Sequence, residues 1–215
     1  MSRRSARALV GALTLVSLAM GCGGRSAPAP EPGTSLGFSP NLDGRRVILL
    51  PVQQVLGVPG DASAELSFAL GDRGRDVEWI PWTEVDAALA RSPGVDTRTQ
   101  QLSVGLFGQA QVERVGDPLF GQLRRMAGLV DADLVLLPLS VTWEVNPAII
   151  DATPRVRFTV ALIAPRTGRV MWYGVEEGDD HPRDDPRALA SAAERLARSL
   201  LWYVREGLET HPATG

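Results

Sequence analysis

The sequence has no lysine and only one cysteine among its 215 residues. A single cysteine excludes an intramolecular disulfide and any metal site built from several thiolates. The permanent positive charges are all arginine and the formal net charge is only −3, so the composition favours neither nucleic-acid binding nor a polyanionic partner. The longest apolar run, residues 8–20, is shorter than the about 20 residues that a bilayer span requires.

The first 22 residues have the layout of a bacterial lipoprotein signal. Arg3, Arg4 and Arg7 precede the apolar run, which ends at Gly21 and Cys22. Residues 18–22 read Leu-Ala-Met-Gly-Cys and resemble a lipobox. We therefore expect a signal peptide over 1–21 and lipidation, with palmitate, at Cys22. The alternative is an ordinary export signal with an incidental cysteine.

Residues 22–43 predict a tether, because the segment after Cys22 is rich in glycine, proline and small residues that cannot bury enough surface to fold. Two or three acyl chains on Cys22 would make membrane attachment stable. Gly23 stands where an aspartate would indicate retention in the inner membrane. The expected location is the bacterial cell envelope, anchored in the outer membrane and facing the periplasm.

Residues 44–209 are long enough for one well-formed core, and 210–215 are expected to be a disordered tail. Apolar runs and alternation predict strands, and apolar residues at helical spacing predict helices. The expected strands are 46–52, 77–81, 134–143, 156–162 and 169–175, and the expected helices are 62–70, 84–91, 119–130 and one from about 186 to before Gly207. This order predicts an α/β fold, a single sandwich of helices packed on a mixed β-sheet with a late antiparallel hairpin.

Several local signals set the expected boundaries. Asp61 is the expected N-cap of the first helix, and Thr83 with Asp86 resembles a capping box for the second. Asp-Pro pairs at 117–118 and 185–186 predict a capping aspartate followed by a proline in the first turn. Gln53 to Gly60 is expected to be a loop, the glycine-containing stretch 95–116 a long loop or a short irregular strand, and 164–168 the turn of the hairpin.

Three segments carry a family resemblance: the strand 46–52, the passage 129–136 and the hairpin 160–172. Together they resemble a recurring envelope-lipoprotein domain found in the curli secretion lipoprotein CsgG, the penicillin-binding-protein activator LpoB and the amino-terminal domain of TolB. Ala164 and Pro165 stand where that hairpin commonly has an aspartate before the turn. The resemblance implies an α/β periplasmic domain and transfers no catalytic residue.

The residues give little support to enzyme chemistry. His181 and His211 lack ligand spacing to each other, and we expect no catalytic residue, no cofactor and no metal. The acidic stretch 176–185 leaves two interpretations, a hard-cation site and a solvated loop before a helix. An active site would require Asp179, Asp180 and Asp184 to converge in one pocket.

The aromatic residues are mostly expected in the core. Trp82, Trp143 and Trp202 lie near the ends of predicted elements, where an exposed ring can anchor a partner. The expected function is a non-catalytic, membrane-anchored adaptor or assembly factor that binds an envelope protein or its own copies. The alternative is an oligomeric component of an envelope transport or secretion apparatus. A pore would need membrane hairpins from 95–115, whose alternation is poor.

Overall fold

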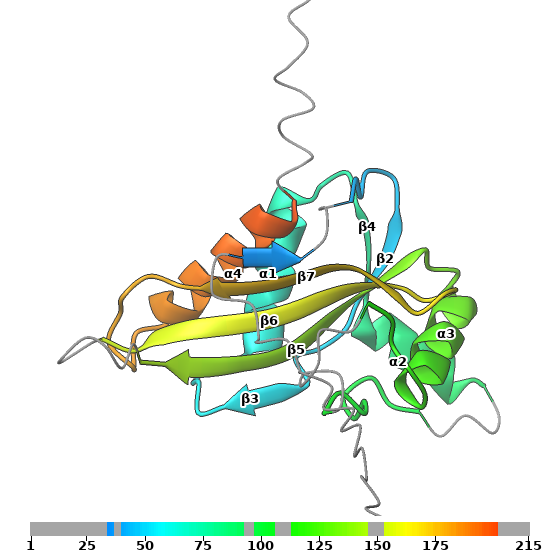
Figure 1. The fold of residues 1–215 in the computed structure, drawn as a ribbon, viewed down its shortest axis with the longest axis horizontal. Helices are drawn as coiled ribbons and strands as arrows, with labels where there is room; N and C mark the ends of the chain where they lie inside the picture. Colours follow the sequence, from blue (N-terminus) through cyan, green and yellow to red (C-terminus); the bar gives the residue numbers. More distant parts are fainter. Residues whose placement is uncertain (1–33, 37–39, 93–96, 106–112, 146–152, 202–215) are drawn as a thin grey trace, which may run out of the picture.

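The computed structural model describes residues 34–36, 40–92, 97–105, 113–145 and 153–201 (Figure 1). The described strands are β1 Thr34–Leu36, β2 Arg46–Leu49, β3 Gln54–Leu56, β4 Glu78–Pro81, β5 Leu134–Glu144, β6 Arg155–Ala164 and β7 Arg169–Glu177. The described helices are α1 Ala62–Arg73, α2 Trp82–Ala90, α3 Leu119–Val130 and α4 Arg187–Leu200. None of these helices is long and apolar enough to cross a membrane.

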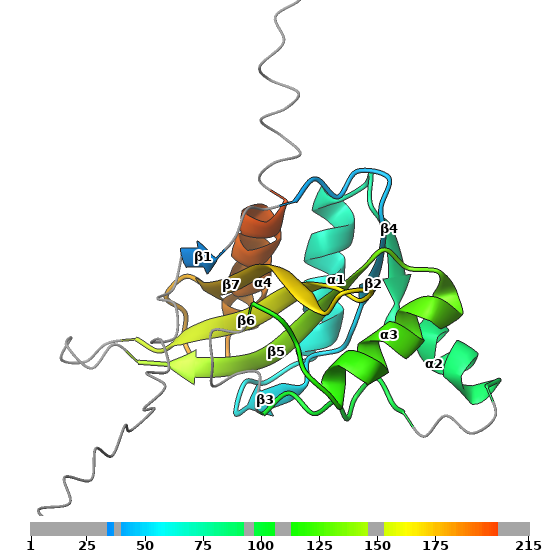
Figure 2. The same ribbon diagram turned by 45° about the vertical axis from the view of Figure 1, so that its right-hand side comes forward.

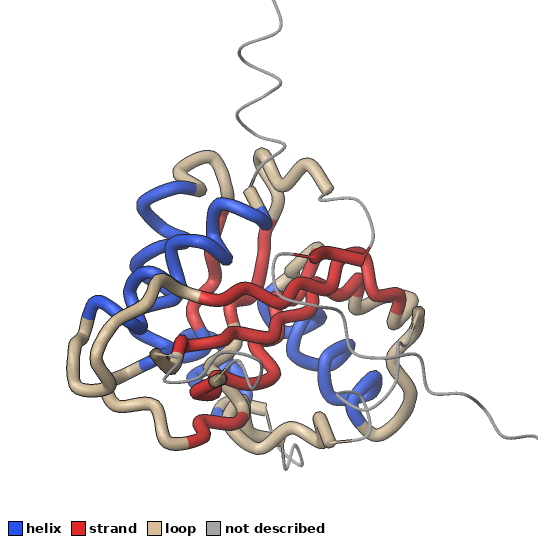
Figure 3. The backbone as a smooth tube through the Cα atoms, turned by 60° about the vertical axis from the view of Figure 1, so that its left-hand side comes forward, coloured by secondary structure: helices blue, strands red, loops and turns tan. Residues whose placement is uncertain are grey.

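The strands form one mixed sheet in the order β1-β7-β6-β5-β2-β4, with β3 paired to β5 beside this path. Pairing is parallel where β2 meets β4 and β5, and antiparallel from β5 through β6 and β7 to β1. Helices α1 and α4 cover one face, and α2 and α3 cover the other (Figures 2 and 3). The predicted α/β sandwich with its late hairpin is therefore confirmed.

A β-bulge in β5 determines which side chains face which helices. The register with β6 shifts between Pro138 and Ser140. Before the shift, Leu136 faces the α1/α4 core and Leu137 the α2/α3 core, whereas after it Val141 faces the α1/α4 core. One extra residue exchanges the two faces of a strand. The bulge thus places Trp143 on the α1/α4 side, where its ring packs against that core.

The helix starts agree only in part with their sequence signals. Asp61 caps α1 as expected, since its Oδ1 accepts hydrogen bonds from the backbone N–H groups of Ser63 and Ala64 at 3.0 Å. The helix continues beyond Leu70 to Arg73 because Gly71 is tolerated inside it, and Gly74 ends it.

The predicted capping box of the second helix is wrong. Helix α2 begins at Trp82 with Pro81 as N-cap and no side-chain cap. Asp86 instead accepts hydrogen bonds from the backbone N–H and the hydroxyl of Thr99, at 3.3 and 2.9 Å. The predicted aspartate caps of α3 and α4 are also wrong by one residue. The N-cap positions are the prolines that follow, Pro118 and Pro186.

Parts of the expected tether and loops belong to the sheet. Strand β1 pairs with β7, and the nearby Leu42 is fully buried, so folded structure includes residues before Gly44.

The strand expected over 46–52 ends at Leu49, and β3 lies within the expected loop 53–60. Of the two structures expected for 95–116, the described parts have the loop, with a single isolated bridge at Arg114 and no named strand. Cys22, Trp202 and His211 lie outside the described residues, as do the expected signal peptide and tail.

The face of β7 under α4 depends on two glycines. A Cβ added at Gly174 would lie 2.1 Å from Cη2 of Trp172, whose fully buried indole lies over that position. A Cβ at Gly178 would lie 2.5 Å from the Ser191 hydroxyl and 2.9 Å from the Ala188 carbonyl oxygen. Both positions must lack a side chain for strand, ring and helix to approach this closely.

Glu176 lies between these glycines and is only 9% exposed. Burial raises the pKa of its carboxyl, while a hydrogen bond with Ser199 and the charge of Arg195 oppose the rise. The raised pKa means that burial outweighs both partners, so the ionised carboxylate is less stable here than in water.

We expect Gly174→Ala to lower the free energy of unfolding by about 1–3 kcal/mol, because the added methyl group overlaps the Trp172 ring. The control is Gly128→Ala on α3, where an added Cβ has no neighbour within 4 Å. This change should leave stability unchanged or raise it by up to about 1 kcal/mol. Urea unfolding of the three proteins measures both effects, and equal midpoints would contradict the assigned packing.

We expect Glu176→Gln to stabilise the protein at pH 7 and to have little effect near pH 4. A raised folded-state pKa contributes stability while the carboxyl is protonated, and this stability is lost as the pH rises from the ordinary value of 4.5 through the folded value. Glutamine keeps the shape and the capacity to bond Ser199 without the buried charge. Thermal unfolding from pH 4 to 8 tests this, and a glutamine variant less stable than wild type at pH 7 would show that the carboxylate is favourably held.

Candidate functional site

The strand β3 forms an exposed edge of the sheet. It follows β2 along the same side of β5: β2 pairs with 134–136 of β5, and β3 with 140–142. Among the described strands β5 is its only partner, and all three β3 residues are exposed. Val55 is 49% and Leu56 59% exposed. A strand edge offers free backbone N–H and C=O groups to another chain, and apolar side chains beside it add contact area.

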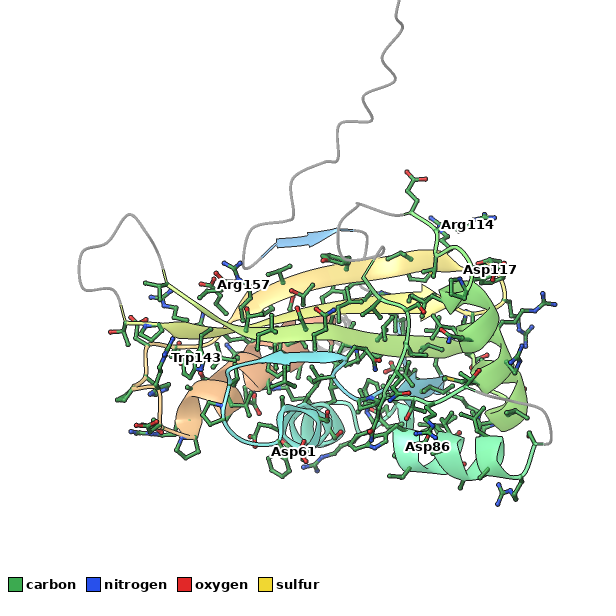
Figure 4. The ribbon with its side chains drawn as sticks, turned by 90° about the horizontal axis from the view of Figure 1, so that it is seen from below. Asp61, Asp86, Arg114, Asp117, Trp143 and Arg157 are labelled. Atoms are coloured by element: carbon green, nitrogen blue, oxygen red, sulfur yellow. The ribbon has the colours of Figure 1, made fainter. Side chains whose placement is uncertain are left out.

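Trp143 adjoins this edge at the end of β5 (Figure 4). Its indole N–H donates a hydrogen bond to the carbonyl oxygen of Gly57, just after β3, at 2.9 Å. The Arg183 guanidinium carbon lies 5.9 Å from the ring centre, within cation–π range. The ring is thus held in place by a hydrogen bond on its rim, a cation over its face and the core beneath it, while remaining partly exposed.

Val145 follows two residues later and is 50% exposed. We define the β3-edge surface as Val55, Leu56, Trp143 and Val145. Apolar side chains on an open strand edge, with an aromatic ring fixed beside them, are the combination that protein interfaces use as anchors. The other large exposed apolar side chains in the described part are Phe68 on α1 and Leu129 on α3.

Ion pairs connect the ends of β5, β6 and β7 next to this surface. Arg157 on β6 contacts Glu144 of β5 at 3.3 Å and Glu177 of β7 at 2.6 Å, so one guanidinium joins three strands. Arg155 donates two hydrogen bonds to Asp180, one to each carboxylate oxygen, and this bidentate pair lowers the pKa of that carboxyl. The end of the sheet that carries Trp143 is therefore cross-linked by charge-assisted hydrogen bonds.

Two further carboxylates of the stretch 176–185 are paired in the same way. Asp179 accepts a hydrogen bond from Arg195 of α4. Asp185 accepts hydrogen bonds from the side chain and backbone N–H of Arg187, which lower its pKa to about 2. A cation at this loop would have to displace arginines from its carboxylates. Asp179 and Asp180 engage partners on different elements, α4 and β6, rather than converging on one point.

The three tryptophans proposed as partner anchors are not brought together. Trp143 belongs to the β3-edge surface. Trp82 is the partly buried first residue of α2, which lies on the opposite face of the sheet from the Trp143 ring. Trp202 lies outside the described residues. Sequence reasoning missed Val55 and Leu56, since a three-residue strand shows no period; their one signal was two adjacent apolar residues between Gln54 and Gly57.

One of three comparisons with known proteins, the search of solved structures, gives partial structural likenesses. No protein-family model and no curated protein matches the sequence. A PelC dodecamer from Paraburkholderia phytofirmans is similar at 18% identity and TM-score 0.42, over 78% of this chain and 94% of that one. The LpoB C-terminal domain from Salmonella enterica is similar at 19% and 0.43, over 63% and 82%. Lipoprotein GNA1162 from Neisseria meningitidis is similar at 13% and 0.38, over 77% and 98%.

LpoB is one of the proteins that the sequence resemblance named, and the resemblance to CsgG and TolB stays a prediction. Identities of 13–19% with TM-scores of 0.38–0.43 describe a partial likeness and assign no function.

Proposed function

We propose that this chain is a lipid-anchored, non-catalytic protein of the bacterial envelope that binds another protein through its β3-edge surface. The observation that carries the proposal is an open strand edge bearing two half-exposed apolar side chains beside a fixed tryptophan. An extended segment of a partner would add a strand next to β3. Its side chains on one face would lie against Val55 and Trp143, and those on the other face against Leu56.

The anchor is supported by the arginine-rich start, the apolar run and Cys22. A domain on a short tether is confined to a thin layer above its membrane, which raises its effective concentration for partners in that layer without any new contact. The residue after the cysteine, Gly23, favours the outer membrane, with the domain in the periplasm.

The non-catalytic part of the proposal is supported by how the acidic residues are used. Four carboxylates of the stretch 176–185 are each bound by a different arginine. A substrate would have to displace an arginine to reach any of these four carboxylates.

An open edge also suits the alternative function, an oligomeric component of a transport or secretion apparatus, because an edge strand accepts a strand from a second copy as readily as from another protein. The two functions can be distinguished by identifying the molecule that binds β3, which is either another protein or a second copy of this chain.

We expect Cys22→Ala to abolish incorporation of labelled palmitate when the full chain is produced in a Gram-negative host. The wild-type protein should carry label, and its intact mass should fit cleavage before Cys22 plus acyl chains, because the acylated thiol is the substrate for processing. Retention of label in the variant, or a wild-type mass without acyl groups, would rule out the anchor.

We expect a photocross-linking residue at Leu56 to capture a defined envelope protein in intact cells, while the same residue at Phe68, an exposed apolar position on α1, captures none. Adding Val55→Lys should lower the yield at position 56 about fivefold or more, since a central interface side chain is worth over about 1 kcal/mol. A product made of two copies of this chain would favour the oligomeric alternative. Equal yields at 56 and 68 would argue against β3 as the docking surface.

A further inference from the structure

The two ends of the β6–β7 hairpin differ in how their charges are paired. At the end near Trp143, Arg155 and Arg157 are bound by carboxylates. At the other end lie the turn 164–168, the segment before α3 and α3 itself. These carry five exposed arginines, which we call the basic end: Arg114, Arg124, Arg125, Arg166 and Arg169. Figure 4 shows Arg114 at the opposite end of the sheet from Trp143 and Arg157.

Backbone contacts hold the basic end together. Arg114 and Arg169 face each other in an isolated β-bridge. The bridge is formed by hydrogen bonds from Val115 N–H to the Gly168 oxygen at 2.7 Å and from Val170 N–H to the Glu113 oxygen at 2.9 Å.

Helix α3 is packed directly on the hairpin turn. A Cβ added at Gly168 would lie 2.9 Å from the Phe120 ring, and Arg124 follows Phe120 by one helical turn. Arginines distant in sequence therefore extend from segments that are packed against one another.

These arginines are not neutralised within the described residues, where none of the five makes an ion pair. The same segments, 113–125 and 164–170, contain only two acidic residues, Glu113 and Asp117, and Asp117 accepts a hydrogen bond from the Gly121 N–H. A protein with net charge −3 thus keeps a locally positive end.

We propose that the basic end rests on the headgroups of anionic phospholipids in the membrane that holds the anchor. Guanidinium groups bind phosphate oxygens well, and several of them spread over an exposed end suit an extended anionic surface rather than one small ligand. The proposal rests on the lipid anchor, which brings such a surface within reach of the domain.

The reach of the tether is sufficient. Thr34 pairs with Val175, and Arg169 lies six residues away along β7, a distance of about 20 Å at 3.3 Å per residue. The 12 residues from Cys22 to Thr34 can span up to about 40 Å. Anchor insertion and contact of the basic end with the same bilayer are therefore geometrically compatible.

The test uses the acylated full chain, in which Cys22 is blocked and an introduced cysteine is the only free thiol. Thr167→Cys in the hairpin turn and Thr153→Cys near the opposite end each receive a fluorophore. The proteins are reconstituted into vesicles of phosphatidylcholine alone, or with a third of phosphatidylglycerol, containing a quencher attached to lipid.

We expect strong quenching at position 167 and weak quenching at 153 in the phosphatidylglycerol vesicles. The difference should disappear in phosphatidylcholine vesicles and at 1 M salt, where the screening length falls to about 3 Å. Each of Arg124→Gln and Arg166→Gln should shift the balance between contacting and detached orientations about fivefold. The exposed Arg91→Gln on the α2 side is the matched control and should cause no shift.

Equal quenching at 167 and 153, or quenching independent of lipid charge, would overturn the proposal, as would a purified chain without acyl groups. Failure of protein docking would appear separately, as a loss of cross-linking at position 56 while quenching at 167 persists.

Discussion

The architecture depends on the close approach of β7 and α4, which requires that positions 174 and 178 carry no side chain. The space above Gly174 is taken by the Trp172 indole, the largest fully buried side chain of the α1/α4 core. The N-terminal part of α4 reaches the sheet over Gly178 through alanines, and its leucines then complete the core with α1. The loop between β7 and α4 is fixed at both ends by this contact, so Arg183 can be held over Trp143.

Strand β5 carries this packing to the candidate docking surface. It is the longest described strand and pairs with β6 along one side and with β2 and β3 along the other. The bulge exchanges the two faces of the sheet to which successive β5 side chains point. Trp143 therefore packs against the same core as Trp172 instead of pointing to the α2/α3 side. A one-residue irregularity thereby determines where the tryptophan meets the β3 edge.

The sequence predicts elements whose signals are local. The hairpin, the buried strand 134–143 and the Asp61 cap follow from alternation, apolar runs and side-chain chemistry within a few residues. Strands β1 and β3 are three residues long and take their conformation from β7 and β5, which no local pattern records. The capping box failed because Asp86 is satisfied by Thr99, thirteen residues away. The sequence predicts Trp143 as a partner anchor because it stands at the end of an apolar run, whereas Arg183 and the open edge beside Trp143 depend on tertiary contacts.

The two ends of the hairpin suit different surroundings for an electrostatic reason. Near Trp143, Arg155 and Arg157 are already bonded to carboxylates and Arg183 lies over the Trp143 ring, so an external anion would compete with partners that are in place. The large apolar side chains exposed there belong to the β3-edge surface. At the basic end, guanidinium groups lack such partners among the described residues and gain most from an anionic surface. Strand β6 separates the ends by ten residues, about 30 Å. A domain resting on lipid headgroups at Arg166 and Arg169 therefore holds the β3-edge surface away from the bilayer, where a protein partner can reach it.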